Sequence, residues 1–442
     1  MSEPAAPAAT TDDEPAPKDL ARILVVAVVV GVVGAIGASV FLEVVHELQH
    51  LAYASLPDAL GIGDAPWWWT GILLVIGATI VLVAQRLPGH TGPGPLTGFH
   101  FGNPLGNVPG ILLAAIGTLV FGVALGPEAP LIVLGAALGM VLLRRSGDPK
   151  ALQAGGFLGG TAAIGAIFGN PFITAFMILE FAAFGVAPAV LILPVLVALG
   201  ASYLVQVGIA GIPGVGIHPL SLENLPAYDH VQVLDLIVAA GVAIVAGLIL
   251  VIAREAALRV ERLATSRRAL ALYATAALTT LAVLIAVNGF GATNDEILFS
   301  GQTGMPQLIA ETSLGLVVVI LAVKLVAYTA ALGSGFRGGP IFPATFIGVG
   351  VAVAGSLIVP DANVSALAAT GIAAGTAAMI KLPATSALLG LLLISGAGAA
   401  IAPFAILGSV FGLILRLVVE RRIDGTDTAP AAGAPGSSPP GH

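Results

Sequence analysis

The chain has 442 residues, of which 57% are hydrophobic and only 9% are charged. A soluble fold cannot present such a composition to water, so these values exclude a soluble enzyme or binding domain and indicate an integral membrane protein. The formal net charge is −7, but much of it lies in the tails, so it says little about partners. The chain has no cysteine, which excludes disulfides and thiolate metal sites. We expect no nucleic-acid partner and no cofactor.

Both ends of the chain differ from its middle. Residues 1–19 are acidic and rich in proline and alanine, and residues 424–442 are similar, which is typical of disordered tails. We therefore expect the function to lie in a membrane core at 20–423. Its first apolar run, about 23–42, is long enough to span a bilayer. Because it lacks a convincing small-residue cleavage site, we interpret it as a retained helix.

A possible zinc motif follows this run, because His46-Glu47-Leu48-Gln49-His50 matches the pattern H-E-x-x-H. On a helix this spacing places two imidazoles on one face as zinc ligands, with the glutamate as a base. Membrane-embedded metalloproteases use the motif, but they need a third ligand. The later hydrophobic segments offer no convincing Asp or His, so a metalloprotease is only a distant alternative and we expect no resident metal.

The apolar segments that follow are short for membrane spans. Several have fewer than the ~20 residues that cross a bilayer, and proline and glycine interrupt many of them. Helices that stop part-way must end at a cavity, because bare backbone in lipid is costly. The pattern predicts an all-α integral membrane fold with many tilted and part-spanning helices.

Basic residues near both ends of the core predict the orientation. Lys18 precedes the first apolar run, and Arg421 and Arg422 follow the last one. Basic flanks favour the cytoplasmic side, so both termini are expected in the cytoplasm and the number of crossings is even. Two inverted halves, at about 20–210 and about 232–423, would satisfy this if each has an odd number of crossings.

Two glycine- and proline-rich blocks repeat along the core. The first covers residues 126–130 and the second covers 339–343, 213 residues later. A further pair of GTAA blocks precedes Pro171 and Pro383, which are 212 residues apart. Two proline-anchored pairs at nearly one offset indicate an inverted repeat, which places the substrate site at the interface of the halves near the membrane midplane.

Each of the first two blocks is a turn that opens an apolar helix. Proline suits the first helical turn, and glycine lets the backbone approach a ligand closely. The free N–H groups and the positive helix end attract an anion, while a full Lys or Arg charge would hold it too tightly for fast release. The predicted anion-binding residues are Gly126, Pro127, Glu128, Ala129, Pro130, Gly339, Pro340, Ile341, Phe342 and Pro343.

Glu128 is the one ionisable residue in these blocks. A carboxylate at membrane depth is costly and usually functional. Burial favours its neutral form, whereas the neighbouring helix end favours the anion. The side chain could therefore occupy the anion site and leave it when protonated or displaced. We predict that Glu128 gates the pathway, with a merely structural glutamate as the alternative.

The blocks resemble the CLC family of chloride channels and proton–chloride antiporters. Residues 117–139, with the sequence GPEAP, resemble the family stretch containing G-[K/R]-E-G-P, and residues 334–348 resemble the stretch containing G-x-F-x-P. Residues 170–180, NPFITAFMILE, resemble the helix that follows the first motif. The resemblance extends over the whole core, in order.

The resemblance implies a CLC-type inverted-repeat fold and a homodimer with one pathway per subunit. Glu128 matches the family's external gating glutamate, and the two blocks match two of its three anion-filter loops. The implied partners are chloride or a similar small anion, the lipid bilayer and, in antiporters, protons. The short core without CBS domains suggests a bacterial inner membrane.

The sequence departs from the family in its filter. The third family motif, G-S-G-I-P, should lie near 88–98, where the serine is missing; His90 or Thr91 could supply a replacement donor. Pro340 stands where family members often supply an N–H, and proline cannot donate one.

The proton route also departs from the family. The glutamate that carries protons in antiporters matches Phe181, which cannot carry one. We therefore predict channel-like passive conduction. Glu180, next to Phe181, is a candidate proton relay, so a proton-coupled antiporter of the same fold remains the alternative.

Overall fold

The computed structural model describes residues 17–185, 187–211, 222 and 225–427. In this part of the chain the regular structure is helical and contains no β-strand, which confirms the predicted all-α class. Ten of the described helices are long and apolar enough to cross a membrane, and shorter apolar helices lie between them. The chain is therefore an integral membrane protein, as its composition indicates.

Within the described residues, the first half of the core contains seven long helices. They are α1 (Pro17–His50), α3 (Trp67–Ala84), α4 (Val108–Leu119), α5 (Glu128–Leu143), α6 (Pro149–Phe168), α7 (Pro171–Ala183) and α8 (Ile192–Ala210). A π-helical turn, η1 (Leu51–Ser55), and the short α2 (Leu56–Ala59) follow α1.

The second half repeats this order. Its long helices are α9 (Val233–Ala264), α10 (Arg268–Val283), α13 (Leu314–Ser334), α14 (Ile341–Ile358), α15 (Val364–Ile380), α16 (Pro383–Leu392) and α17 (Ala402–Asp427). The short elements η5 (Leu284–Gly289), α11 (Asn294–Ile297) and α12 (Met305–Ala310) lie between α10 and α13.

The ends of the core differ slightly from the prediction. Helix α1 begins at Pro17 and α17 ends at Asp427, so both helices extend a few residues into the predicted tails. Charged residues at these ends can be solvated beyond the bilayer, which lets a helix continue past the apolar run. The rest of each predicted tail lies outside the described residues.

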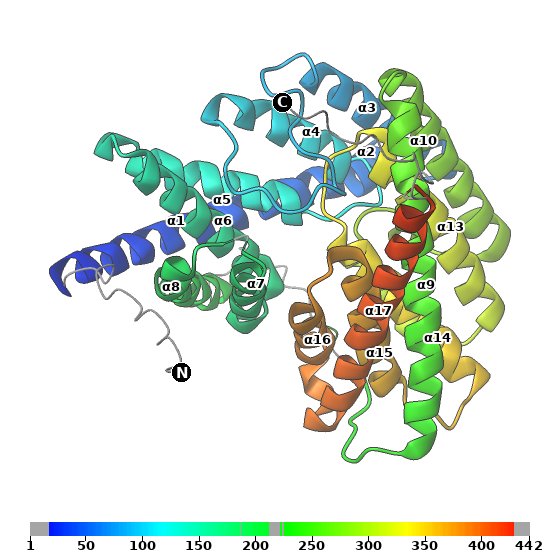
Figure 1. Ribbon diagram of the computed structural model, residues 1–442. Coiled ribbons are helices and arrows are strands. Elements are labelled where there is room, and N and C mark those ends of the chain that lie inside the picture. Colours follow the sequence, from blue (N-terminus) through cyan, green and yellow to red (C-terminus); the bar gives the residue numbers. More distant parts are fainter. Residues whose placement is uncertain (1–16, 186, 212–221, 223–224, 428–442) are drawn as a thin grey trace, which may run out of the picture.

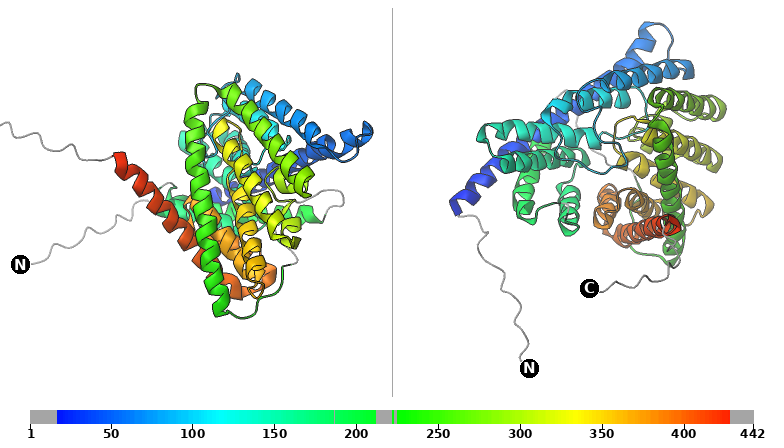
Figure 2. Two further views of the ribbon diagram at one scale, coloured as in Figure 1. Left: turned by 90° about the vertical axis from the view of Figure 1, so that its right-hand side faces the viewer. Right: turned by 45° about the horizontal axis from the view of Figure 1, so that its top comes forward.

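The two halves lie side by side and meet along several helices. Figures 1 and 2 show the helices of the first half, coloured blue to green, beside those of the second half, coloured green to red. Helix α3 packs against α10, and α7 packs against α16, so both contacts cross between the halves. The site described below lies where these halves join.

Equivalent glycines bring equivalent helices together in each half. A Cβ atom on Gly135 of α5 would collide with the carbonyl oxygen of Gly159 on α6. A Cβ atom on Gly348 of α14 would likewise collide with the carbonyl oxygen of Gly371 on α15. These backbones approach closely only because both partners lack side chains. The same contact at an offset of 213 and 212 residues supports the repeat read from the sequence.

Candidate functional site

The two repeated blocks meet and pair with each other. The backbone N–H of Gly126 donates to the carbonyl oxygen of Gly339 at 2.8 Å, and the N–H of Gly339 donates back to Gly126 at 2.5 Å. Helix α5 starts two residues after Gly126, and α14 starts two residues after Gly339. The structure therefore brings the N-termini of two repeat-related helices to one buried place.

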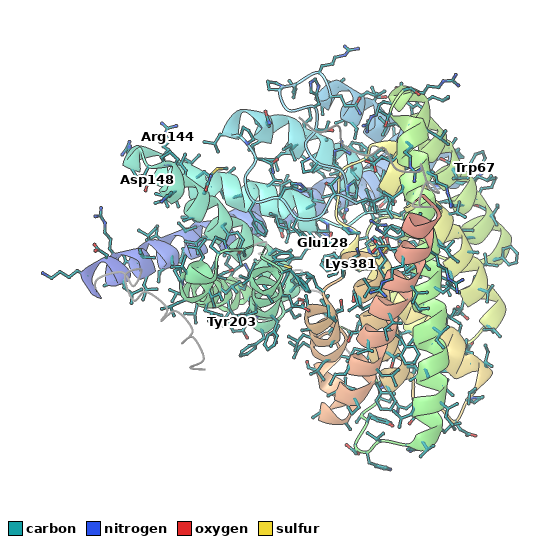
Figure 3. All side chains as sticks on the ribbon, viewed as in Figure 1. Trp67, Glu128, Arg144, Asp148, Tyr203 and Lys381 are labelled. Atoms are coloured by element: carbon teal, nitrogen blue, oxygen red, sulfur yellow. The ribbon has the colours of Figure 1, made fainter. Side chains whose placement is uncertain are left out.

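Glu128 reaches from the first half to the second. Its Oε1 accepts a hydrogen bond from the backbone N–H of Phe342 at 2.8 Å, and the N–H groups of Ile341 and of Glu128 itself also face the carboxylate. The side chain is fully buried, and its Oε2 finds no hydrogen-bond partner among the described residues. Figure 3 shows Glu128 where the two groups of helices meet. A carboxylate thus occupies the amide site at the start of α14.

The paired glycines leave room for this carboxylate. A Cβ atom built on Gly126 or on Gly339 would collide with the carboxylate group of Glu128. Any other residue at either position would therefore displace the Glu128 side chain or separate the two blocks. Pro340 donates no N–H here, and its carbonyl oxygen instead accepts the hydroxyl of the buried Tyr328 at 2.8 Å. This hydrogen bond from Tyr328 fixes the position of the second block.

A large cavity reaches the site from one side. We call it the vestibule; its volume is about 1030 Å³, and its lining includes Leu125, Pro127, His46, His50, Tyr53, Asp295 and Phe299. Leu125 precedes the first block and Pro127 lies within it, so the vestibule extends to the residue directly before Glu128 in the chain. Such a cavity gives an ion in water a route to the buried site.

Both histidines of the H-E-x-x-H sequence lie at the vestibule. His46 and His50 lie near the end of α1 and line this cavity, and Nδ1 of His50 lies 3.3 Å from the hydroxyl of Ser55. Among the described residues, no group of three or more His, Cys, Asp or Glu side chains could hold a metal ion. The structure therefore gives the zinc hypothesis no third ligand within the described residues.

A buried lysine beside the vestibule was not predicted from the sequence. Lys324 of α13 is fully buried, and its Nζ donates to the carbonyl oxygens of Leu298 at 2.7 Å and Phe299 at 3.2 Å. Burial raises the pKa of the Asp295 carboxyl in the vestibule wall, and the charge of Lys324 opposes that shift. Lys324 therefore fixes the wall segment 298–299 next to the vestibule.

A second, smaller cavity adjoins the first block at Ala129 and Pro130. We call it the Arg337 cavity; its volume is about 30 Å³, and its lining residues are Pro93, Gly94, Gly98, Phe99, His100, Ile111, Ala129, Pro130, Ile132, Val133, Arg337 and Gly338. That volume is about the share of one water molecule in the liquid. The cavity joins the first block, the segment before the second block and the loop in which we expected the third filter motif.

Thr91 and His90, the two predicted donors of that loop, have different positions. The Thr91 side chain is fully buried, its hydroxyl finds no partner among the described residues, and its carbonyl oxygen accepts a hydrogen bond from Arg337. His90 lies on an exposed turn, where its Nδ1 is 3.0 Å from the carbonyl oxygen of Gln85. Only Thr91 is thus connected to the site, and neither residue lines the Arg337 cavity.

Arg337 is the main residue that the sequence analysis missed. It is only 9% exposed, and its backbone N–H donates to the hydroxyl of Thr118 at 3.0 Å. Burial, assisted by the nearby charge of Arg268, lowers the pKa of its guanidinium to about 10, while Glu261 acts in the opposite direction. Arg337 therefore stays protonated at neutral pH. A basic residue inside the glycine run SGFRGG, two positions before the block, was the available signal.

Glu180 lies at the contact between α7 and α16. Its carboxylate accepts hydrogen bonds from the N–H groups of Ala384 at 2.7 Å and Thr385 at 2.8 Å, and from the Thr385 hydroxyl at 2.5 Å. The residue before α16, Leu382, provides no side-chain cap. Glu180 therefore caps a helix of the other half, and both of its oxygens are engaged there.

Replacing Glu180 should weaken the contact between the halves. We expect Glu180→Ala to reduce the free energy of unfolding by about 2–3 kcal/mol, because charge-assisted bonds to a helix N-terminus are lost. The measurement is the thermal midpoint of the purified protein in detergent. Glu47→Ala, at an exposed position of α1, is the matched control and should change little. Equal midpoints for both variants would contradict the capping role.

Phe181, next to Glu180, packs inside an aromatic cluster. Its ring centroid lies 5.7 Å from that of Phe99 and 6.3 Å from that of Phe101. Phe99 lines the Arg337 cavity, and Phe181 is buried. The position that matches the family's proton-carrying glutamate is therefore filled by an apolar ring.

Comparisons with known proteins identify relatives of this chain. A family model described as "Voltage gated chloride channel" matches residues 77–415. The chain is also similar to YfeO, provisionally named an ion-transport protein, from Escherichia coli O139:H28 (strain E24377A / ETEC) and from Shigella boydii serotype 4 (strain Sb227). Each is 29% identical over 331 residues, which cover 73% of this chain and 76% of the relative.

Solved structures share the fold. A slow cyanobacterial Cl−/H+ antiporter superposes with a TM-score of 0.75 at 16% identity, covering 94% of this chain and 100% of that one. A CLC-type fluoride/proton antiporter superposes with a TM-score of 0.70 at 17% identity, covering 91% of this chain and 96% of that one. Similarity at these identities establishes the architecture.

Proposed function

The chain belongs to the voltage-gated chloride channel family, and from this premise we propose that it conducts chloride or a similar small anion passively, with Glu128 as the gate. The observation that carries the proposal is the hydrogen bond from the Phe342 N–H to the Glu128 carboxylate. The start of α14 binds a negatively charged group there through backbone dipoles. An anion of similar charge can compete for the same N–H groups when the carboxylate leaves.

Two cavities that adjoin the first block support a pathway through this point. The vestibule includes Pro127 in its lining, and the Arg337 cavity includes Ala129. These residues directly precede and follow Glu128 in the chain. We therefore expect that movement of the Glu128 side chain opens a connection between the two cavities.

Passive conduction is supported by the surroundings of the expected proton route. Phe181 cannot carry a proton, and the Glu180 carboxylate is engaged by the start of α16. The second candidate is proton-coupled exchange through Glu128 alone. It is favoured by the unpartnered Oε2 of Glu128, where a proton could bind, and by the antiporters among the structural relatives.

Simultaneous measurement of chloride and proton fluxes distinguishes passive conduction from proton-coupled exchange. We expect purified protein in liposomes to dissipate a chloride gradient without moving protons, because Phe181 fills the expected proton-carrying position and the Glu180 carboxylate is engaged by α16. Chloride-sensitive and pH-sensitive electrodes would record both fluxes, with protein-free liposomes as the control. Proton uptake in fixed proportion to chloride release would establish the coupled alternative, and no anion flux at all would reject both.

We further propose a homodimer in a bacterial inner membrane with both termini in the cytoplasm. The bacterial relatives support this location, and Lys18 and Arg22 at the start of α1 support the orientation. Helix α1 would then carry His46 and the vestibule to the external side. The Arg337 cavity would be cytoplasmic, because Arg268 follows the basic end of α9 and lies next to Gly335.

A further inference from the structure

We propose that the outer face of helix α3 binds an anionic phospholipid, with an acyl chain in a groove between α3 and α4 and the phosphate on Arg86 and Arg267. The proposal goes beyond the proposed function, because it concerns a lipid at the protein surface and depends on no ion movement. Three features of this face carry it: an apolar groove, a pair of hydroxyl groups beside the groove, and two exposed arginines at its end.

Helix α3 has tryptophans at one end and an arginine at the other. Its 18 residues extend over about 27 Å, which is close to the thickness of the hydrocarbon layer. Trp67 and Trp68 at its start are both exposed, as is typical of side chains at a membrane interface. Arg86 lies just beyond its last residue and is also exposed. The Arg86 end therefore reaches the headgroups of one leaflet, which is the cytoplasmic leaflet in the orientation proposed above.

An apolar groove lies on the outer side of this helix. Its volume is about 280 Å³, and its lining residues are Val75, Ile76, Thr79, Ile80 and Val83 of α3 and Leu113 of α4. A Cβ atom on Gly77 would collide with the carbonyl oxygen of Gly117, so the two helix backbones touch at the bottom of the groove. Figure 1 shows α3 between α4 and α10. Because most of the lining residues are exposed, the groove opens toward the bilayer, where a hydrocarbon chain can fill it.

Two hydroxyl groups lie beside the groove. Oγ1 of Thr79 lies 3.1 Å from the hydroxyl of Tyr273 on α10, and it donates to the carbonyl oxygen of Val75 at 2.8 Å. Both side chains are exposed. Since Thr79 can stay bonded to Val75, the Tyr273 hydroxyl is able to turn outward and donate to a ligand. Thr79 lies about 10 Å along the helix from Arg86, just below the headgroup layer, which is the depth of the ester groups of a phospholipid.

Arg86 and Arg267 lie at the same end of the packed helices α3 and α10. Their chain neighbours, Gln85 and Arg268, both approach Gly335. A Cβ atom on Gly335 would lie 3.1 Å from Nη1 of Arg268 and 3.8 Å from Nε2 of Gln85. Arg86 and Arg267 are themselves exposed, and within the described residues neither guanidinium forms a hydrogen bond or an ion pair. Both are therefore available to a phosphate at the end of the groove.

The charge of this surface favours an anionic lipid. Residues 259–268 include four arginines and one glutamate. The guanidinium group of arginine matches a phosphate with two parallel hydrogen bonds. A zwitterionic lipid carries its own ammonium group next to the phosphate, whereas an anionic lipid leaves its negative charge for Arg86 and Arg267. Leu270, exposed one turn after Arg267, adds apolar surface beside the charges, a combination typical of membrane interfaces.

Lipid retention by the purified protein tests the role of the arginines. The full-length protein in detergent would be mixed with equal amounts of phosphatidylglycerol and phosphatidylcholine, and native mass spectrometry would count the bound lipids. We expect the wild type to prefer phosphatidylglycerol, and the double variant Arg86→Gln/Arg267→Gln to bind it about tenfold more weakly, because two charges at the phosphate are lost. The matched control is Arg144→Gln/Arg145→Gln, at exposed arginines far from Trp67 in Figure 3, which should keep wild-type binding.

A groove-filling variant separates a defined site from general attraction to a basic surface. Val75→Trp changes no charge, and we expect it to weaken phosphatidylglycerol binding about tenfold, because displacing about two methylene groups from the groove has an effect of this size. Val25→Trp, at an exposed position of α1, is its control and should bind as the wild type does. Unchanged binding by either Val75→Trp or the Arg86/Arg267 variant would overturn the proposal, and so would an equal loss in the Arg144/Arg145 control. The readout does not involve transport, so it stays informative if the proposed function fails.

Discussion

Glu128→Gln is expected to raise chloride flux at neutral and alkaline pH by about tenfold and to remove its pH dependence. The glutamine matches the shape of the acid but has no charge. A charged acceptor binds the Phe342 N–H more tightly than a neutral one by about 1–2 kcal/mol, so the carboxylate closes the site more firmly than the amide does. Wild-type flux should therefore increase as the pH falls, because a protonated Glu128 releases the N–H group.

The measurement is the rate of chloride efflux from liposomes over a series from acidic to alkaline pH. Glu47→Gln, at an exposed glutamate of α1, is the matched control and should keep the wild-type profile. If Glu128→Gln kept both the wild-type rate and the wild-type pH dependence, Glu128 would be a structural residue and the gate would lie elsewhere.

Gly348→Val is expected to have the largest effect on stability, with a loss of about 3 kcal/mol or more. The added Cβ would collide with the backbone of Gly371, and backbone atoms cannot move aside as a flexible side chain can. Helices α14 and α15 would have to separate. Because α14 begins at Ile341, the same shift would displace the Phe342 N–H and lower chloride flux as well.

Thermal midpoints and the monodisperse fraction in size-exclusion chromatography would measure this effect. Gly241→Val is the matched control, because Gly241 on α9 has no atom within 4 Å of an added Cβ. Gly135→Val, the repeat-related change, should destabilise the protein similarly, since its Cβ would collide with the Gly159 carbonyl oxygen. Equal midpoints for the variants of Gly348 and Gly241 would disprove the close-contact explanation.

The inverted repeat explains why the halves share some features and divide others. Both halves use a glycine pair to bring two helices together and a proline-containing turn to open a helix. Of the two repeated blocks, the first carries a carboxylate, Glu128, and the second presents it with the N–H of Phe342. This asymmetry avoids electrostatic repulsion, because a symmetrical pair of carboxylates at one site would repel each other.

A similar division occurs at the ends of α7 and α16. Helix α7 has a local cap, since the side chain of Asn170 accepts the N–H of Phe172. Helix α16 has none and depends on Glu180 of the first half. Helix α16 is thus capped by a residue of its repeat-related counterpart, α7. This gives Glu180 a positioning role that agrees with passive conduction.

The sequence alone determined the features that depend on composition and local pattern. The apolar content and the segment lengths predicted a membrane-embedded all-α protein, because lipid tolerates no unpaired backbone. The turn chemistry of 126–130 and 339–343, repeated at one offset, predicted that both blocks open helices. Glu128 was identifiable because an ionisable residue in such a place is costly.

Only the tertiary structure decided which groups meet. The N–H that binds Glu128 belongs to a residue 214 positions away, and a rotation of α14 by one residue would present a different one. The capping of α16 by Glu180 and the place of Arg337 beside the loop at 88–98 are also long-range contacts. Sequence periodicity specifies how each helix begins and which face is apolar, whereas the packing of whole helices sets the partners of a side chain.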